Sequence, residues 1–352
     1  MIAQFDRPLA GIITSPREPW YAEAAFHDDL AKLVTSNAPT AQKITGLARF
    51  LHLSGQSTQT DQWEALVEIA AIDVAVARML EPHVDALGIL AEAGHESPDA
   101  HSTWGVYAAD VPEFAVAAND EGGQTLLTGE KAWCSLAAEL THAIVIVEGI
   151  DGSRACAVDL TNSRVQAQTV SWPSLGLKEI PSGSVMFDHA PATTVGPPNW
   201  YLDRPSFAWG GIRVAACWFG GAVGMARNAA HRHLRRPTPS PMGELQLGQL
   251  DAEISAVRAV MAQAAAAADG DDEFSRAEAW TLALRVRNIV YRSVQRVQHL
   301  SRELAGPAAL TGDAGFAKAD ADLTVYLSQH HGLRDEAALG GDLYKRSHGD
   351  EL

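Results

Sequence analysis

The chain has 352 residues, of which 47% are hydrophobic and 20% charged, a composition typical of a globular protein with two or three domains. It holds 27 Lys and Arg against 43 Asp and Glu, so its formal net charge of −16 disfavours nucleic acid as a partner. No apolar run approaches the roughly 20 residues that a membrane span needs.

The cysteines and the N-terminal stretch predict the compartment. The three cysteines are widely spaced and form no C-x-x-C pair, which suits a reducing compartment and gives no metal-binding pattern. The first 20 residues lack the basic start and apolar core of a signal peptide. We therefore expect a cytoplasmic protein without a membrane segment.

The first region, from about residue 18 to residue 94, has the apolar spacing of helices. Leu66, Ile69, Ile72 and Val76 recur at intervals of three and four residues, as on one face of a helix. Pro82 predicts the first turn of a new helix, because proline lacks the N–H that a helix interior uses.

Residues 102–197 change to short runs of β-branched and apolar residues, separated by turns rich in Gly, Asp and Asn. Six runs indicate strands, namely FAVAAN, QTLLTG, HAIVIVE, RACAVD, VQAQTV and SVMFDH. Their spacing predicts a small antiparallel barrel or sandwich.

Beyond the proline-rich VGPPNWYLDRP the helical period returns in Ala-rich segments at 206–235, 245–269, 273–304 and 317–338. Four long helices with short links predict a four-helix bundle. The predicted fold class is thus α+β, with an N-terminal helical domain (1–100), a central β-domain (101–197) and the C-terminal bundle (198–352). The Ala-rich composition equally suits a bundle without an active site.

The stretch TGEKAWCS extends the second predicted strand with a Trp, a Cys and a hydroxyl residue. A Trp in a strand is more often part of a core than of a cofactor site. Here it belongs to the pattern G-x-K-x-W-[IC]-[TS], which spans Gly129, Lys131, Trp133, Cys134 and Ser135. In this motif, and in the order of its domains, the chain resembles the acyl-CoA dehydrogenase superfamily. The resemblance implies that Trp133, Cys134 and Ser135 form one wall of a flavin site, with the Ser135 hydroxyl reaching the isoalloxazine ring.

Two later stretches, GLKEIPSGSVMFDHAPA and RVAACWFGGAVGMA, extend the resemblance from about residue 60 to the C-terminus. Counting back from the motif without gaps, TWGVYAAD takes the place of the family's first flavin loop. The resemblance implies Ser102, Thr103 and Trp104 as further flavin contacts, with the Thr103 hydroxyl donating to the pyrimidine edge. Trp104 replaces an acid, and two glycines that allow close approach are replaced by larger residues.

Two other flavin elements of the family are also altered in this chain. LRRPTPSPMGELQLGQL stands where relatives have an R-x-F-G turn, and AGPAALTGDAGF stands for the adenine loop G-G-x-G-[FY]. Both changes affect the phosphate and adenine side of the cofactor. The implied cofactor is therefore FAD, held loosely, or FMN.

The family's catalytic carboxylate commonly lies near the end of the chain, and ADLTVYLSQHHG places His330 at that position, with His331 beside it. The family's other base position, in GGIRVAACWFGG, holds no carboxylate either. The resemblance implies His330 and His331 as catalytic residues, because an imidazole can act as a base near neutral pH. The alternative is that the pair merely ends a solvent-facing helix.

The resemblance implies a flavin-dependent oxidoreductase, and the first hypothesis is oxidation of an acyl thioester, such as an acyl-CoA, at Cα–Cβ. The second is monooxygenation of a small aromatic or polyketide-like substrate by reduced flavin from a separate flavin reductase, a use of this scaffold by certain relatives with His at this position. The third is a flavin-free scaffold or binding subunit. The small residues of AACWFGGAVGMARNAA predict self-association of the bundle into a homodimer or homotetramer.

Overall fold

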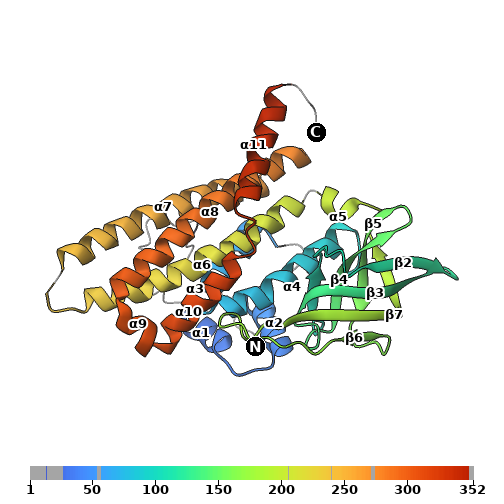
Figure 1. Cartoon of the computed structure of the whole chain (residues 1–352), viewed down its shortest axis with the longest axis horizontal. Helices are drawn as coiled ribbons and strands as arrows, with labels where there is room; N and C mark the ends of the chain where they lie inside the picture. Colours follow the sequence, from blue (N-terminus) through green and yellow to red (C-terminus); the bar gives the residue numbers. More distant parts are fainter. Residues whose placement is uncertain are drawn as a thin grey trace.

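The computed structural model describes residue 13 and residues 27–53, 57–204, 206–238, 240–270 and 274–348. Figure 1 shows long helices packed side by side at one end and a β-barrel at the other, with helix α4 running between them. The largest buried apolar cluster includes residues of both parts, such as Leu66 of the helices and Val145 and Phe187 of the barrel. The predicted helical region begins at about residue 18, and its part before residue 27 lies outside the described residues.

The N-terminal part is helical, with α1 (His27–Val34), α2 (Thr40–Phe50), α3 (Gln59–Ile72) and α4 (Val74–Glu92). The predicted helix start at Pro82 is wrong, because Pro82 lies inside α4. The boundary is at Asp73, whose carboxylate accepts the N–H groups of Ala75 and Val76 and so caps α4. Buried Leu80 and Val84 pack on both sides of Pro82, and this packing keeps the helix continuous.

Seven strands follow, and each of the six predicted runs overlaps one of them. They are β1 (Trp104–Tyr107), β2 (Val116–Glu121), β3 (Gln124–Ser135), β4 (His142–Gly149), β5 (Gly152–Asp159), β6 (Val165–Ala167) and β7 (Ser182–Val195). The strand order is β1-β4-β2-β3-β7-β5, and an additional β4–β5 pairing closes the sheet into a barrel.

The barrel is mixed and not purely antiparallel, which corrects the prediction. Strands β1 and β2 both pair with β4 in parallel, at successive positions along the same edge. The sequence indicated no strand at β1, because the gapless count assigned residues 103–110 to a flavin loop. Trp104–Tyr107 instead pairs with residues 142–145, and the first loop of the barrel is residues 108–115.

The C-terminal part contains α5 (Trp200–Asp203), α6 (Phe207–Leu234), α7 (Pro241–Asp269), α8 (Arg276–Ala305), α9 (Pro307–Gly312), α10 (Ala314–Leu327) and α11 (Leu333–Ser347). Helices α6, α7 and α8 correspond to the first three predicted bundle helices. The predicted last helix, 317–338, is wrong as one element, because α10 ends at Leu327 and α11 begins at Leu333. Gly332 between them has a φ of +58°, which an α-helix does not accommodate. Helix α11 projects away from the bundle (Figure 1).

Helix α6 lies in the middle of the bundle, and its small residues serve contacts within the chain. Ala215, Ala222, Ala226 and Ala230 are fully buried in this single chain. These small residues of the stretch that predicted self-association therefore pack within the chain, and the homodimer or homotetramer stays a prediction. Large exposed apolar side chains are found on several described elements, among them Leu234 at the end of α6, Met242 in α7 and Leu333 and Tyr344 in α11.

We expect Gly220→Ala in α6 to lower the free energy of unfolding by about 1–3 kcal/mol, the usual cost of overpacking. A Cβ at Gly220 would lie 2.3 Å from the carbonyl oxygen of Val67, because α3 and α6 approach each other closely there. The matched control is Gly248→Ala in α7, where an added Cβ meets nothing within 4 Å. Urea denaturation should show that Gly248→Ala is neutral or slightly stabilising. Equal effects of the two substitutions would contradict the close packing of α3 against α6.

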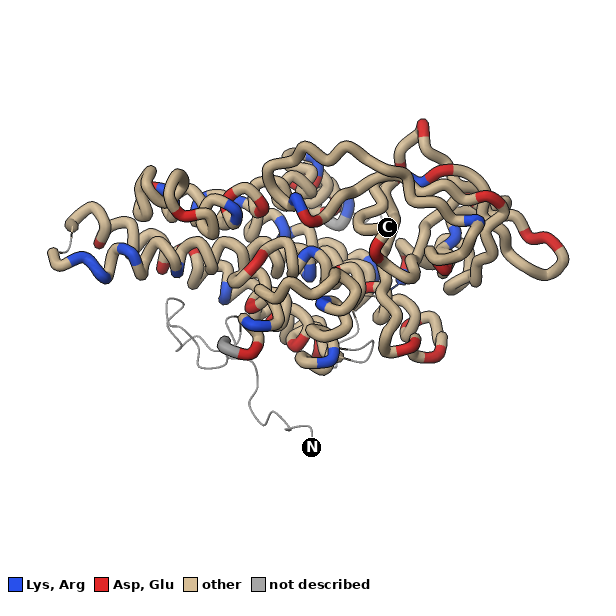
Figure 2. Tube along the Cα trace, turned by 90° about the horizontal axis from the view of Figure 1, so that it is seen from below, with Lys and Arg blue, Asp and Glu red and all other residues tan. Residues whose placement is uncertain are grey.

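The charged residues are dispersed over the molecule. Figure 2 shows Lys and Arg interspersed with Asp and Glu along the helices. None of the described helices combines the length and the apolar character that a bilayer span requires. The described residues also contain no group of three His, Cys, Asp or Glu that could hold a metal ion.

Candidate flavin site at the junction of barrel and bundle

Trp133 lies at an irregular point near the end of β3. The pairing of β3 with β7 shifts register between Lys131 and Cys134, so the chain bulges at this position. Trp133 has a φ of +58°, which is costly for a residue with a bulky side chain, and 60% of its surface is exposed. A strained backbone that presents an indole to solvent is typical of a binding site and not of a core position.

Ser135, two residues further on, lies where three other elements meet β3. Its hydroxyl is 2.8 Å from that of Ser182 in β7, and Arg78 of α4 donates to it at 3.4 Å. The hydroxyl of Tyr107 in β1 donates to the carbonyl oxygen of Ser135 at 3.1 Å. The structure therefore brings Ser135 together with polar groups from α4 and two neighbouring strands.

Cys134 points the other way, into the barrel. Its thiol is buried and lies 3.3 Å from the carbonyl oxygen of Lys131. Burial raises the pKa of Cys134 to about 12, so the thiol stays protonated at neutral pH. Lys131 is also buried and donates to the carbonyl oxygen of Ile146 at 2.6 Å, which ties β3 to β4. A flavin contact by Cys134 would have to come from its backbone.

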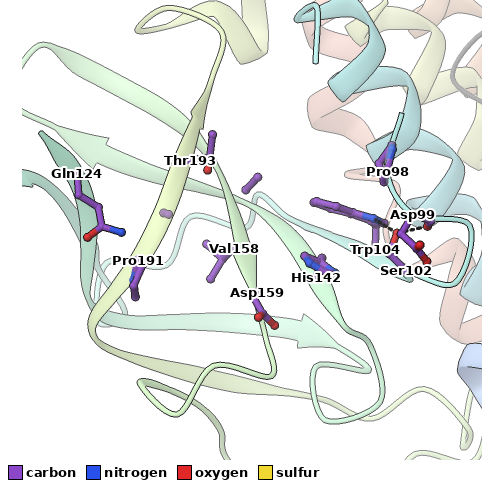
Figure 3. Close-up of a pocket in the computed structure, with 12 residues that line it drawn as sticks. Pro98, Asp99, Ser102, Trp104, Gln124, His142, Val158, Asp159, Pro191 and Thr193 are labelled. Atoms are coloured by element: carbon purple, nitrogen blue, oxygen red, sulfur yellow. Dashed lines mark hydrogen bonds between the residues drawn. The ribbon is translucent and has the colours of Figure 1, made fainter. Parts of the chain in front are cut away.

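The predicted contacts Ser102, Thr103 and Trp104 lie at a different place. Ser102 accepts from the Trp104 indole at 2.8 Å, and the Trp104 ring stacks on that of His142 with centroids 4.6 Å apart. Figure 3 shows Ser102, Trp104 and His142 at one side of a pocket of about 400 Å³ that extends over β5 and β7. Neither Trp133 nor Ser135 lines this pocket.

Thr103 itself is fully buried, and its hydroxyl accepts the N–H of Thr141 at 3.1 Å. In β1, successive side chains alternate between the two faces of the strand. Trp104 and Tyr107 therefore point to opposite faces, and only Tyr107 reaches Ser135. The structure does not bring the predicted pyrimidine contact at Thr103 together with the Trp133–Ser135 wall, so that contact stays a prediction.

His330 lies in the turn between α10 and α11 and its side chain is fully buried. Its Nε2 is 2.9 Å from Oδ1 of Asn288, and its Nδ1 accepts the N–H of Gly332 at 2.9 Å. Since Nδ1 accepts, Nε2 carries the proton, and the imidazole is neutral. Its ring stacks on Tyr291 at a centroid distance of 4.0 Å. Burial lowers the pKa of His330, which also favours the neutral form.

His331 differs from its neighbour, because 63% of its side chain is exposed and its Nδ1 lies 3.3 Å from a carboxylate oxygen of Asp335. The two predicted catalytic residues thus have unlike environments. The Trp218 ring contacts His330 edge to face at 6.0 Å and Tyr326 at 6.3 Å. Through Tyr326, which lies under the Arg78 guanidinium, His330 is connected to the polar groups around Ser135.

Two charged residues of α4 at this junction, Arg78 and Glu81, were missed by the sequence reasoning. They stand three residues apart in VAVARMLEPHV, an otherwise apolar stretch, and that isolation was the available signal. Burial raises the pKa of Glu81 to about 7, although the charge of Arg78 acts against the rise. Burial would also raise the pKa of Asp85, one turn further on, but Arg204 and Arg213 hold it below its ordinary value.

These residues fit the ring of a flavin better than its adenine end. An exposed indole, two serine hydroxyls and a guanidinium suit an isoalloxazine ring with its hydrogen-bonding edge. The segment that corresponds to the family's adenine loop forms helix α9 and the cap of α10, where Asp313 accepts the N–H of Phe316. The segment LRRPTPSPMGELQLGQL, which stands where relatives have the R-x-F-G turn, contains the first residue of α7, Pro241.

No protein-family model matches the sequence, and no curated protein matches it significantly. Solved structures do match. KijD3, determined with FMN and dTDP-3-amino-2,3,6-trideoxy-4-keto-3-methyl-D-glucose, is 18% identical with a TM-score of 0.74, over 98% of this chain and 93% of KijD3. The monooxygenase TdsC from Paenibacillus sp. A11-2, in complex with FMN and indole, is 17% identical with a TM-score of 0.74, over 86% of this chain and 90% of TdsC.

Butyryl-CoA dehydrogenase from Megasphaera elsdenii is 16% identical with a TM-score of 0.75, over 92% of this chain and 99% of that protein. The chain therefore has the acyl-CoA dehydrogenase fold, and the predicted resemblance is confirmed at this level. With identities of 16–18%, it is a far-diverged example of that fold.

Proposed function

We propose that this protein is a flavin-dependent monooxygenase that uses reduced FMN and dioxygen to oxygenate a small organic substrate. The observation that carries the proposal is the state of His330. Both of its ring nitrogens are hydrogen-bonded and the imidazole is neutral, in the turn where an acyl-CoA dehydrogenase would carry its catalytic carboxylate. The turn between α10 and α11, residues 328–332, contains no acidic residue.

Thioester oxidation needs a base that removes the α-proton of the substrate. His330 could take this proton only after losing its bond from Gly332, and burial lowers its pKa, which makes it a weaker base than an ordinary imidazole. Oxygenation of an electron-rich substrate does not require a carboxylate at this position. We therefore favour the monooxygenase over thioester oxidation, the first hypothesis from the sequence, and His330 acts as a positioning residue.

FMN is the proposed cofactor because the groups that suit it are those of the ring site. Trp133 would cover one face of the isoalloxazine ring, and Ser135 would donate to its edge. Bound in reduced form, the flavin supplies two electrons, so that one atom of dioxygen enters the substrate and the other leaves as water. Such a flavin is supplied by a separate reductase, which we propose as a partner. Titration with FMN and FAD should give similar affinities, because the adenine end gains few contacts.

The protein residues bind, orient and exclude water in this proposal. The strained turn at Trp133 holds the indole in the orientation in which it would cover a flavin ring. Arg78 lies over the Tyr326 ring, and Tyr326 contacts Trp218 edge to face, so these large side chains would limit the access of water to the polar groups around Ser135. His330 holds the α10–α11 turn in place through Asn288 and packs on Trp218.

The test supplies purified protein with FMN, NADH and an unrelated flavin reductase under isotopically heavy dioxygen. Indole and a series of phenols and heteroaromatic compounds serve as probes. We expect at least one product that carries one heavy oxygen atom and forms only when this protein is present. A flavin that is reduced anaerobically by an acyl-CoA, without any oxygenated product from the probes, would contradict the proposal.

A further inference from the structure

Arg78 is the point at which the flavin wall, helix α4 and helix α10 meet. Its Nη2 donates to the Ser135 hydroxyl at 3.4 Å, and its Nη1 lies 3.7 Å from a carboxylate oxygen of Glu81. Its guanidinium carbon lies 5.7 Å from the centre of the Tyr326 ring. The side chain is 15% exposed, so it is largely withdrawn from water and still open on one side.

The hydrogen bonds of Arg78 are few for a guanidinium at this depth. A guanidinium has five N–H donors. Among the described residues, Arg78 uses one of them in a hydrogen bond, to the Ser135 hydroxyl at the long distance of 3.4 Å. The contrast is Arg213 in α6, which donates to Gln62 and Gln59 and pairs with Asp85 at 2.8 Å. The donors of Arg78 that no described residue uses are therefore open to a further acceptor on the exposed side of the guanidinium.

Glu81 does not balance this charge at every pH. Its carboxyl group has a pKa of about 7 because of burial, and it faces charged groups of α4, α6 and α8, namely Arg78, Asp85, Arg213 and Arg287. Tyr326 of α10 and Cys217 of α6 adjoin it and remain protonated, since burial raises the pKa of each. Below about pH 7 Glu81 is neutral, and Arg78 then lacks a charged partner among the described residues.

We propose that Arg78 binds an anionic oxygen of the substrate, such as that of a carboxylate or a phenolate, beside the flavin wall. This inference rests on the proposed function, because it names the substrate class of the same site. The planar fork of a guanidinium matches two oxygens of a carboxylate, and withdrawal from water strengthens the contact. Its bond to Ser135 places that oxygen next to the residue that would touch the flavin. Arg78 thus selects acidic substrates and orients them toward the ring.

The test measures binding of benzoate and its neutral analogue benzamide to the flavin-free protein by calorimetry. We expect benzoate to bind, and Arg78→Gln to weaken it by about tenfold or more while benzamide changes less than about twofold. Arg285→Gln, on an exposed position of α8, is the matched control and should leave both unchanged. Wild-type protein that does not bind benzoate, or Arg78→Gln that binds it as wild type does, overturns the inference.

A second variant keeps the test decisive if Arg78→Gln does not fold. Benzoate affinity of the wild type should fall as the pH rises from about 6 to about 8, because ionised Glu81 then competes for Arg78. Glu81→Gln should bind benzoate at about pH 6 and at about pH 8 as tightly as the wild type does at about pH 6. An unchanged pH profile in Glu81→Gln contradicts the inference. No flavin is present, so these results do not depend on whether the protein oxygenates or dehydrogenates its substrate.

Discussion

Trp133→Gly is expected to weaken FMN binding by about tenfold to a hundredfold, because a planar ring loses the indole on which it stacks. The same substitution should raise the free energy of unfolding by about 1 kcal/mol, since glycine adopts a positive φ without steric cost. Little packing is lost, because 60% of Trp133 is exposed. Fluorescence titration with FMN and urea denaturation measure the two effects.

The control for the backbone effect is His189→Gly in β7. His189 also has a positive φ, of 50°, and an exposed side chain, but it lies outside the proposed flavin wall. It should gain similar stability and bind FMN as the wild type does. If Trp133→Gly destabilises the protein and leaves FMN affinity unchanged, the indole is a structural residue and the flavin wall is placed wrongly.

His330→Ala is expected to lower the free energy of unfolding by about 2–4 kcal/mol, because it leaves Asn288 and the N–H of Gly332 unpaired and opens space beside Tyr291. His331→Ala, on the exposed neighbour, should change stability by no more than about 0.5 kcal/mol. Equal effects of the two substitutions would show that His330 does not hold the turn.

The stability of the wild type should also depend on pH through His330. Its pKa is lowered in the folded state, so the unfolded chain binds a proton more readily. Stability from this residue is therefore full above the unfolded pKa of about 6.5 and is lost as the pH falls below it. His330→Ala should remove this part of the pH profile.

The turnover rate of His330→Ala distinguishes a positioning role of His330 from a role as general base. If His330 were the base, His330→Ala would lower turnover by about 10²–10⁴-fold under conditions in which it remains folded. We expect a loss of about tenfold or less. His330→Glu adds a further check, because recovery of acyl-CoA oxidation in that variant would indicate a dehydrogenase that has lost its carboxylate.

Much of the fold could be predicted from the sequence, because periodicity and turn residues report local structure directly. The six short runs and the first three bundle segments each correspond to an observed element, and the fourth segment spans two helices, α10 and α11. Pro82 misled the prediction, since the cap at Asp73 and packing on both sides outweigh the missing N–H. The parallel strand β1 was missed because the gapless count assigned its residues to a flavin loop, whereas Trp104–Tyr107 pairs with residues 142–145.

The site was only partly predictable, because it depends on contacts between distant segments. The motif at Trp133 and Ser135 was recognisable, and its exposure and strain now give it a physical basis. The gapless count placed Thr103 in the same wall, but its hydroxyl is bound to Thr141. No local pattern showed that Arg78 of α4 reaches Ser135, 57 residues away, or that Asn288 fixes the tautomer of His330.

The most direct test of the central claim is an anaerobic titration of the FMN-loaded protein with a series of straight-chain acyl-CoAs, butyryl-CoA among them. The flavin's visible absorption band reports whether hydride leaves the thioester. We expect the band to keep its intensity with every acyl-CoA and to bleach only when NADH and a flavin reductase are added. Bleaching by an acyl-CoA alone would contradict it, and would show that the protein oxidises thioesters without a carboxylate in the α10–α11 turn.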